Sequence, residues 1–237
     1  MKQLAMIGYK ALSASLRTSM ARSTQKCPLC EARKAKRFCP AKLVQICPVC
    51  CGTKREVEID CTSDCVYLQA GREYENQRTS RQESSQPLTQ RLWSRSFRTK
   101  HYETLVGLWS KIHKARSESP ALVDGDVREV IDQLIRTYQT QAEGIYFDHV
   151  PNTLTQKALY GVLKSYLEEK QNQQDLATPT LKTNDLLDCL QLSLEMAGFT
   201  DQSRPKSRAF LDQLGSIVAE ANPKAHPTVA PSGIVLP

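Results

Sequence analysis

The chain of 237 residues is long enough for one sizeable domain, or for one domain joined to a small module. Apolar residues make up 40% and charged residues 24%, which permits a packed core, and no run of 18 apolar residues exists to predict a transmembrane helix. Aromatic residues (6%) and glycines (10) are too scarce for a typical β-sandwich or barrel, so the composition favours helices. The net charge of +7 divides into +12 for residues 1–120 and −5 for residues 121–237, so any basic surface belongs to the N-terminal half.

The first 26 residues contain five cations and no acid, and they lack the apolar stretch of a secretory signal. This composition leaves three interpretations open: a disordered or wrongly assigned start, with Met20 as the true first residue; an organelle transit peptide; and a genuine helix. We expect a disordered or wrongly assigned start over residues 1–26. At the other end, the proline-rich segment 222–237 predicts a disordered tail.

Eight of the nine cysteines fall within residues 27–65, with the spacing C-x2-C-x8-C-x7-C-x2-C-C-x9-C-x3-C. So many cysteines in so short a segment predict a small module that is built around them, followed by an ordinary domain over residues 66–221. Thiolate is a soft ligand that suits zinc, and eight thiols suit two tetrahedral sites of four sulfurs each. The predicted ligands of two zinc ions are Cys27, Cys30, Cys39, Cys47, Cys50, Cys51, Cys61 and Cys65.

Two pairings are compatible with this spacing. In the interleaved pairing, which we favour, the two C-x2-C pairs bind one ion through Cys27, Cys30, Cys47 and Cys50. The other four thiols then bind the second ion through Cys39, Cys51, Cys61 and Cys65. In the alternative pairing, one firm site has the ligands Cys47, Cys50, Cys61 and Cys65, and the N-terminal cysteines complete a second, less regular site.

Residues 55–60 (REVEID) alternate between charged and apolar side chains and predict a short strand. The next five residues, 61–65 (CTSDC), predict the start of a helix. A knuckle, a strand and a helix start are the parts of a treble-clef or cross-brace zinc finger. The sequence therefore predicts a mainly α protein in which such a finger precedes a helical domain.

From residue 66 onward, apolar residues recur at helical spacing, and breaks at proline, glycine and capping residues divide the pattern. We predict helix caps at Asp126, Asn152 and Thr183 and a helix end at Gly198. Cys189 is predicted to be a small core residue. The predicted helices form a bundle of five or six and cover residues 66–81, 88–116, 126–143, 153–171, 184–197 and 203–220.

Other chemistries compete with zinc for the cysteines. An iron–sulfur cluster also takes four thiolates, but the closely spaced three-cysteine runs of ferredoxins are missing. Disulfides suit a small module in an oxidising compartment, whereas the chain shows no secretory signal, so we expect reduced thiols and a cytoplasmic location. The vicinal pair Cys50–Cys51 also permits a strained disulfide, and with it a redox or metal sensor.

The segment RFCPAKLVQICPVCCGTKREVEIDCTSDCVYL, with CPLC ahead of it, resembles the head of an uncharacterised bacterial protein family. Its members combine a CPxC…ICxxCCGTKR…CxxxC head with an all-helical remainder, which LIRTYQTQAEGIYFDHVPNTLTQKA resembles more loosely. The resemblance implies a zinc-binding head and names no reaction. The head is also distantly similar to HIT and MYND zinc fingers, which end in a C-x3-C helix start, although it lacks their closing His and Cys.

Six cations between the cysteines offer phosphate contacts to a nucleic acid: Arg33, Lys34, Lys36, Arg37, Lys54 and Arg55. The alternative, which we favour, is a solvated surface, because neighbouring acids dilute the cluster. Catalysis has little support, since the four histidines are scattered and form no metal-binding or triad pattern.

We therefore predict a non-enzymatic zinc-binding protein whose metal-ordered basic head binds a protein or a nucleic acid. We predict no membrane contact and no small-molecule substrate. The alternative function is a nucleic-acid-binding regulator that uses the basic N-terminal half. A thiol-based redox or metal sensor and an iron–sulfur protein are less favoured.

Overall fold

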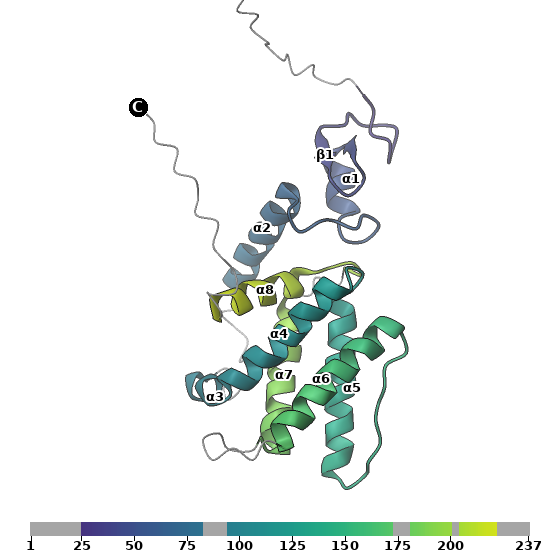
Figure 1. The fold of residues 1–237 in the computed structure, drawn as a ribbon. Helices are drawn as coiled ribbons and strands as arrows, with labels where there is room; N and C mark the ends of the chain where they lie inside the picture. The colour runs from purple at the N-terminus through teal and green to yellow at the C-terminus, as the bar shows by residue number, and fades with distance from the viewer. Residues whose placement is uncertain (1–24, 83–93, 173–180, 201–203, 222–237) are drawn as a thin grey trace, which may run out of the picture.

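The protein consists of a small cysteine-containing head and a group of packed helices (Figure 1). The computed structural model describes residues 25–82, 94–172, 181–200 and 204–221. Helices account for most of these residues, and a two-stranded sheet lies beside the cysteines, so the predicted mainly α fold class is confirmed. The predicted tail and all but the last two residues of the predicted N-terminal segment lie outside the described residues.

The head contains one hairpin and one short helix. Strands β1 (Arg37–Cys39) and β2 (Val44–Ile46) pair antiparallel, and α1 (Pro48–Thr53) follows directly. The buried core of the head consists of four cysteines and two isoleucines: Cys27, Cys39, Cys47, Cys50, Ile46 and Ile59. Two isoleucines bury too little apolar area to hold a fold of this size together, so the cysteines must contribute through their own chemistry.

The predicted strand at residues 55–60 is wrong. Only an isolated bridge joins Arg55 to Ile59, and the chain turns between them, with a φ of +53° at Glu56. Glu56 is 2% exposed and Val57 is 42% exposed, the reverse of what their side chains suggest. The side chain of Glu56 is buried because two arginines outside this segment form ion pairs with its carboxylate. A local alternation of charged and apolar residues cannot reveal these ion pairs.

Helices α3 (Arg95–Lys100) to α8 (Ala209–Ala221) share one core. Helices α4 to α8 pack in pairs, with α4 against α6 and α8 and with α5 against α6 and α7. Trp109 of α4 lies in this core, and its indole N–H donates to Ser193 Oγ at 3.0 Å; Cys189 is buried there as predicted. The helices are α2 (Val66–Gln82), α3 (Arg95–Lys100), α4 (Tyr102–Glu118), α5 (Asp124–Ala142), α6 (Leu154–Asn172), α7 (Thr183–Thr200) and α8 (Ala209–Ala221).

Several predicted helix ends differ from the observed ones. The predicted helix over 88–116 is interrupted at His101, which separates α3 from α4, and its first residues lie outside the described part. Asp126 is the third residue of α5, where its carboxylate accepts the N–H of Val123 at 3.3 Å. Thr153, not Asn152, caps α6, since its hydroxyl accepts the N–H of Gln156 at 3.2 Å.

Gly198 lies within α7, and α8 begins six residues later than predicted. The reason for the late start is a cap from a distant element. The carboxylate of Asp124, which is 1% exposed, accepts the N–H groups of Phe210 and Leu211 at 3.1 Å each and the hydroxyl of Ser207 at 2.8 Å. Burial raises the pKa of this carboxyl, although these three donors oppose the shift.

Replacing Asp124 with alanine is expected to lower the free energy of unfolding by about 2 kcal/mol, because it leaves two buried N–H groups of α8 without an acceptor. Asp124→Asn retains an acceptor oxygen and is expected to be much less destabilising. Urea denaturation measures both. The exposed Asp132, which pairs with Arg136 one turn away, provides the control: Asp132→Ala should change the free energy of unfolding by less than about 0.5 kcal/mol. Equal losses for the two Asp124 variants would contradict the capping role.

Among the described helices, none combines the length and the apolar character that a membrane crossing requires.

Candidate metal centre

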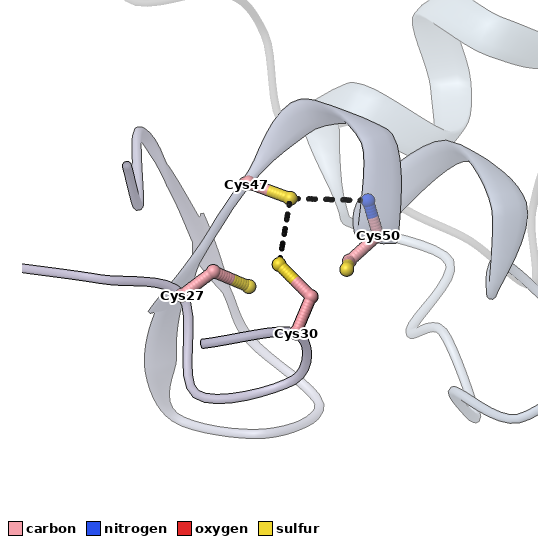
Figure 2. A group of neighbouring side chains, drawn as sticks. All are labelled: Cys27, Cys30, Cys47 and Cys50. Carbon is pink, nitrogen blue, oxygen red and sulfur yellow. Dashed lines mark hydrogen bonds between the residues drawn. The ribbon is translucent and has the colours of Figure 1, made fainter. Parts of the chain in front are cut away.

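The first C-x2-C pair lies on a tight turn ahead of β1. The N–H groups of Cys30 and Glu31 donate to the carbonyl oxygen of Cys27 at 3.3 and 2.7 Å, and the N–H of Cys27 donates to the carbonyl of Arg33 at 2.8 Å. Glu31 has a φ of +52° and turns the chain sharply at this point. As Figure 2 shows, the turn directs both sulfurs of the pair to the same side.

The second C-x2-C pair lies at the start of α1. Cys47 caps this helix, since its Sγ accepts the N–H of Cys50 at 3.3 Å, and Pro48 occupies the first helical position, where no N–H is needed. Residues three apart lie on the same face of a helix turn, so both sulfurs point towards the first pair. The hairpin, which lies between the two pairs in sequence, brings them together.

The four sulfurs of Cys27, Cys30, Cys47 and Cys50 all lie within 4.8 Å of one another (Figure 2). The sulfurs of Cys30 and Cys47 are 3.9 Å apart. Zinc bound by four thiolates at about 2.3 Å places neighbouring sulfurs about 3.8 Å apart, so the donor set and its spacing fit a tetrahedral zinc ion. Three of the four cysteines are buried, and Cys30 is half-buried.

The thiols of this cluster differ in acidity. Hydrogen bonds from the N–H groups of Arg33 and Ala32 lower the pKa of Cys30 to about 6. Burial opposes ionisation of Cys27, but hydrogen bonds from Cys47 and Leu29 outweigh it and lower its pKa.

Burial and then the neighbouring sulfurs raise the pKa of Cys50 to about 12. Four thiolates can therefore occupy this space only with a cation between them. Ionisation of the whole set and binding of a metal ion are one linked event.

The structure does not gather the second predicted set in the same way. Among the described residues, only the first set has all its sulfurs within 4.8 Å. Cys39 and Cys65 are buried, and Cys51 and Cys61 are partly buried. Burial, and then the charges of Glu56, Cys65 and Cys39, raise the pKa of Cys61, although an N–H bond from Glu56 opposes the shift. Cys61 therefore lies within electrostatic reach of Cys39 and Cys65, but the four thiols form no closed cluster.

A buried carboxylate joins the head to the helices. Glu56 Oε1 accepts from Arg72 Nη2 at 2.6 Å, and Glu56 Oε2 accepts from Arg204 Nη1 at 3.3 Å. The backbone N–H of Lys206 donates to the carbonyl oxygen of Glu56 at 2.9 Å. The segment between α1 and α2, which contains no regular structure, is thereby held by residues from both ends of the helical part.

Further contacts extend this attachment towards α8. Ser63 Oγ donates to Asp212 Oδ1 at 3.0 Å, and Arg72 pairs with the other oxygen of Asp212 at 2.7 Å. Arg208 is hydrogen-bonded to Asp60 and lowers the pKa of that carboxyl. Residues 56–63 therefore connect the cysteines to α2 and α8. Sequence reasoning missed this association because most of its partners, Arg204, Arg208 and Asp212, lie 148 or 149 residues away.

Half of the predicted nucleic-acid contacts are engaged within the protein. Lys54 pairs with Glu58 at 2.6 Å, and the guanidinium of Arg37 lies over the ring of Tyr67 at 4.7 Å from its centroid. Arg55 packs so closely against α2 that a Cβ at Gly71 would lie 1.6 Å from its Nη1. The other three cations are exposed and form no ion pair with any described residue: Arg33, Lys34 and Lys36.

None of the nine thiols forms a disulfide. Comparisons of the chain with protein-family models, with curated proteins and with solved structures gave no match. The similarity of the head to HIT and MYND zinc fingers therefore gains no support from them, and the candidate site depends on the geometry of the four cysteines.

Proposed function

We propose that the protein is a non-enzymatic, zinc-dependent binding module. One zinc ion holds Cys27, Cys30, Cys47 and Cys50 together, and this ion takes the place of the apolar core that the head lacks. The observation that carries the proposal is the convergence of four sulfurs within 4.8 Å of one another. A second zinc ion is proposed for the remaining set, Cys39, Cys51, Cys61 and Cys65.

The spacing favours a single ion over an iron–sulfur cluster. An iron–sulfur cluster places several iron and sulfide atoms between its thiolates and so holds the cysteine sulfurs farther apart. The sulfurs here all lie within 4.8 Å of one another, a separation that fits four thiolates around a single zinc ion. Thiolate ligation also fits a reducing compartment, and a cytoplasmic location is part of the proposal.

The zinc-ordered head then presents a fixed basic surface to an anionic partner, either a protein or a nucleic acid. The contacts of Glu56, Asp60 and Ser63 hold the head against α2 and α8, so its opposite side remains available. The head carries three exposed cations that form no ion pair with any described residue: Arg33, Lys34 and Lys36.

A nucleic acid is the second candidate, and one further observation favours it. Phe38 of β1 is 49% exposed and lies two residues after the exposed Lys36. An exposed ring among cations is the arrangement on which proteins stack the bases of single-stranded nucleic acids.

The test is the anisotropy of a fluorescent oligothymidine or oligouridine strand titrated with zinc-loaded protein. Three phosphate contacts predict that a fourfold rise in salt weakens binding by about twentyfold. Lys34→Glu with Lys36→Glu should remove binding, whereas Lys114→Glu, on the exposed face of α4, should not. Absence of salt-dependent binding by zinc-loaded protein would reject the nucleic acid and leave a protein as the partner.

A further inference from the structure

The segment between α5 and α6 exposes four large apolar side chains within six residues. Ile145 is 56% exposed, Tyr146 85%, Phe147 60% and Val150 50%. Figure 1 shows that this segment runs along the outside of the helices, from the end of α5 to the start of α6. Contiguous apolar exposure on a soluble protein marks an interaction surface, whereas single exposed apolar residues do not.

Hydrogen bonds fix the backbone of this segment. Gly144, with a φ of +83°, ends α5 and turns the chain. The N–H of Ile145 then donates to the carbonyl oxygen of Thr140 at 2.9 Å, and the N–H of His149 donates to Thr137 Oγ1 at 2.9 Å. The exposed rings are therefore presented from a fixed backbone, which reduces the entropy that a partner's binding must overcome.

A groove of about 400 Å³ lies between this segment and α6. Six of its lining residues are Gln141, Tyr146, Phe147, Asp148, Lys164 and Glu168. Lys164 Nζ is hydrogen-bonded to Asp148 and lies 3.6 Å from Glu168 Oε1. Two carboxylates thus share one ammonium group, and the lining keeps a net negative charge beside two aromatic rings.

A polar group next to the groove has no partner. Tyr138 is 1% exposed, and its hydroxyl forms no hydrogen bond with any described residue. Burial, and then the charge of Glu168, raise the pKa of this hydroxyl, so the hydroxyl lies within electrostatic reach of the groove's carboxylate. Nε2 of His149 likewise has no partner among the described residues. Buried polar groups of this kind are usually satisfied by a ligand or by ordered water.

We infer that this groove binds a protein segment that presents an arginine or lysine side chain next to an apolar residue. The cation enters between the rings of Tyr146 and Phe147 and shares the carboxylate of Glu168. Aromatic faces attract cations, and this attraction strengthens when water is excluded. The apolar neighbour packs on Ile145 and Val150, outside the groove.

Charge distinguishes this partner from others. Residues 121–237 carry a net charge of −5, which repels nucleic acids and anionic membranes. A small cationic molecule would fill the groove but leave Ile145 and Val150 uncovered. A basic, partly apolar protein segment matches both the charge and the extent of the surface, and its binding does not depend on the metal in the head.

The test uses the full zinc-loaded chain and two synthetic peptides, acetyl-Leu-Arg-Leu-amide and acetyl-Leu-Glu-Leu-amide. In ¹⁵N-correlation NMR spectra, the arginine peptide should cause saturable shifts confined to residues 137–168. Phe147→Ala and Glu168→Gln should each weaken its binding by about fivefold, the loss expected for one exposed cation–π or ionic contact. The matched control is Tyr102→Ala, which removes a similarly exposed ring from α4 and should change nothing.

Three results would overturn the inference. These are no shifts with the arginine peptide, equal shifts with the glutamate peptide, and shifts at residues 137–168 caused by an oligothymidine strand instead. The side chains of Phe147 and Glu168 are both exposed, and Lys164 still pairs with Asp148 in Glu168→Gln. Neither substitution is therefore expected to unfold the protein.

Discussion

Replacing Cys50 with serine is expected to remove one zinc ion from each chain, and replacing the adjacent Cys51 is expected to remove the other. Cys50 belongs to the set whose sulfurs all lie within 4.8 Å of one another. Cys51 follows about 100° farther around α1, so its sulfur is directed away from that ion. Serine is a poor ligand for zinc, and each tetrahedral site needs all four sulfurs. Native mass spectrometry of the two variants counts the ions that remain.

The loss at Cys50 should also unfold the part of the head around the first C-x2-C pair. Binding of structural zinc contributes about 10–16 kcal/mol of apparent free energy in small zinc fingers, and this energy is available only to the folded state. The buried core of the head offers only Ile46 and Ile59 in its place. Amide signals of residues 25–36, which contain the first C-x2-C pair, should therefore lose their dispersion, while those of Cys61 and Cys65 at the second site and the far-ultraviolet circular dichroism of α4 to α8 remain.

The ninth cysteine provides the control. Cys189 is buried in the helical core, where burial raises its pKa to about 12, and it lies in no cluster with the other thiols. Cys189→Ala should leave both ions bound, although it removes a packed side chain. If either Cys50→Ser or Cys51→Ser retains two ions, or if either variant loses both, the two-site assignment is wrong.

Replacing Glu56 with glutamine is expected to weaken the attachment of the head to the helices. The carboxylate is 3% exposed and binds Arg72 and Arg204, so its loss leaves two partly buried guanidinium groups without their shared counter-ion. Breaking a buried ion pair from one side lowers the free energy of unfolding by about 3 kcal/mol. The backbone N–H of Lys206, which donates to the carbonyl oxygen of Glu56, should then exchange with solvent much faster. Hydrogen exchange of the zinc-loaded protein measures this directly.

Glu58, two residues away, is the matched control. Its side chain is 62% exposed and pairs with Lys54 at 2.6 Å. Glu58→Gln should change the free energy of unfolding by less than about 0.5 kcal/mol and leave the exchange of Lys206 unaltered. Equal effects of the two substitutions would show that Glu56 does not join the head to the helices.

Sequence reasoning succeeded where local patterns decide the structure. The spacing of each C-x2-C pair constrains its two sulfurs to one side of a turn. The favoured pairing of Cys27, Cys30, Cys47 and Cys50 agrees with the cluster in the structure, although the spacing alone left a second pairing open. The helical periodicity located α4 to α8 because each of these helices buries one apolar face. Cys189 was correctly assigned to the core for the same reason.

The predictions failed where a distant residue determines the local structure. The alternating pattern predicts an exposed side chain for Glu56, whereas ion pairs with Arg72 and Arg204 stabilise it in a buried position. The start of α8 was misplaced because its cap, Asp124, comes from the start of α5. Neither association leaves a periodic signal in the sequence, since both depend on how separate helices pack.

X-ray absorption at the zinc edge of the purified protein tests the central claim most directly. The account predicts stoichiometric zinc whose nearest neighbours are four sulfur atoms at about 2.3 Å, with no nitrogen or oxygen ligand. A sample without stoichiometric zinc, an iron–sulfur signal in its place, or a zinc site with nitrogen or oxygen ligands would contradict it.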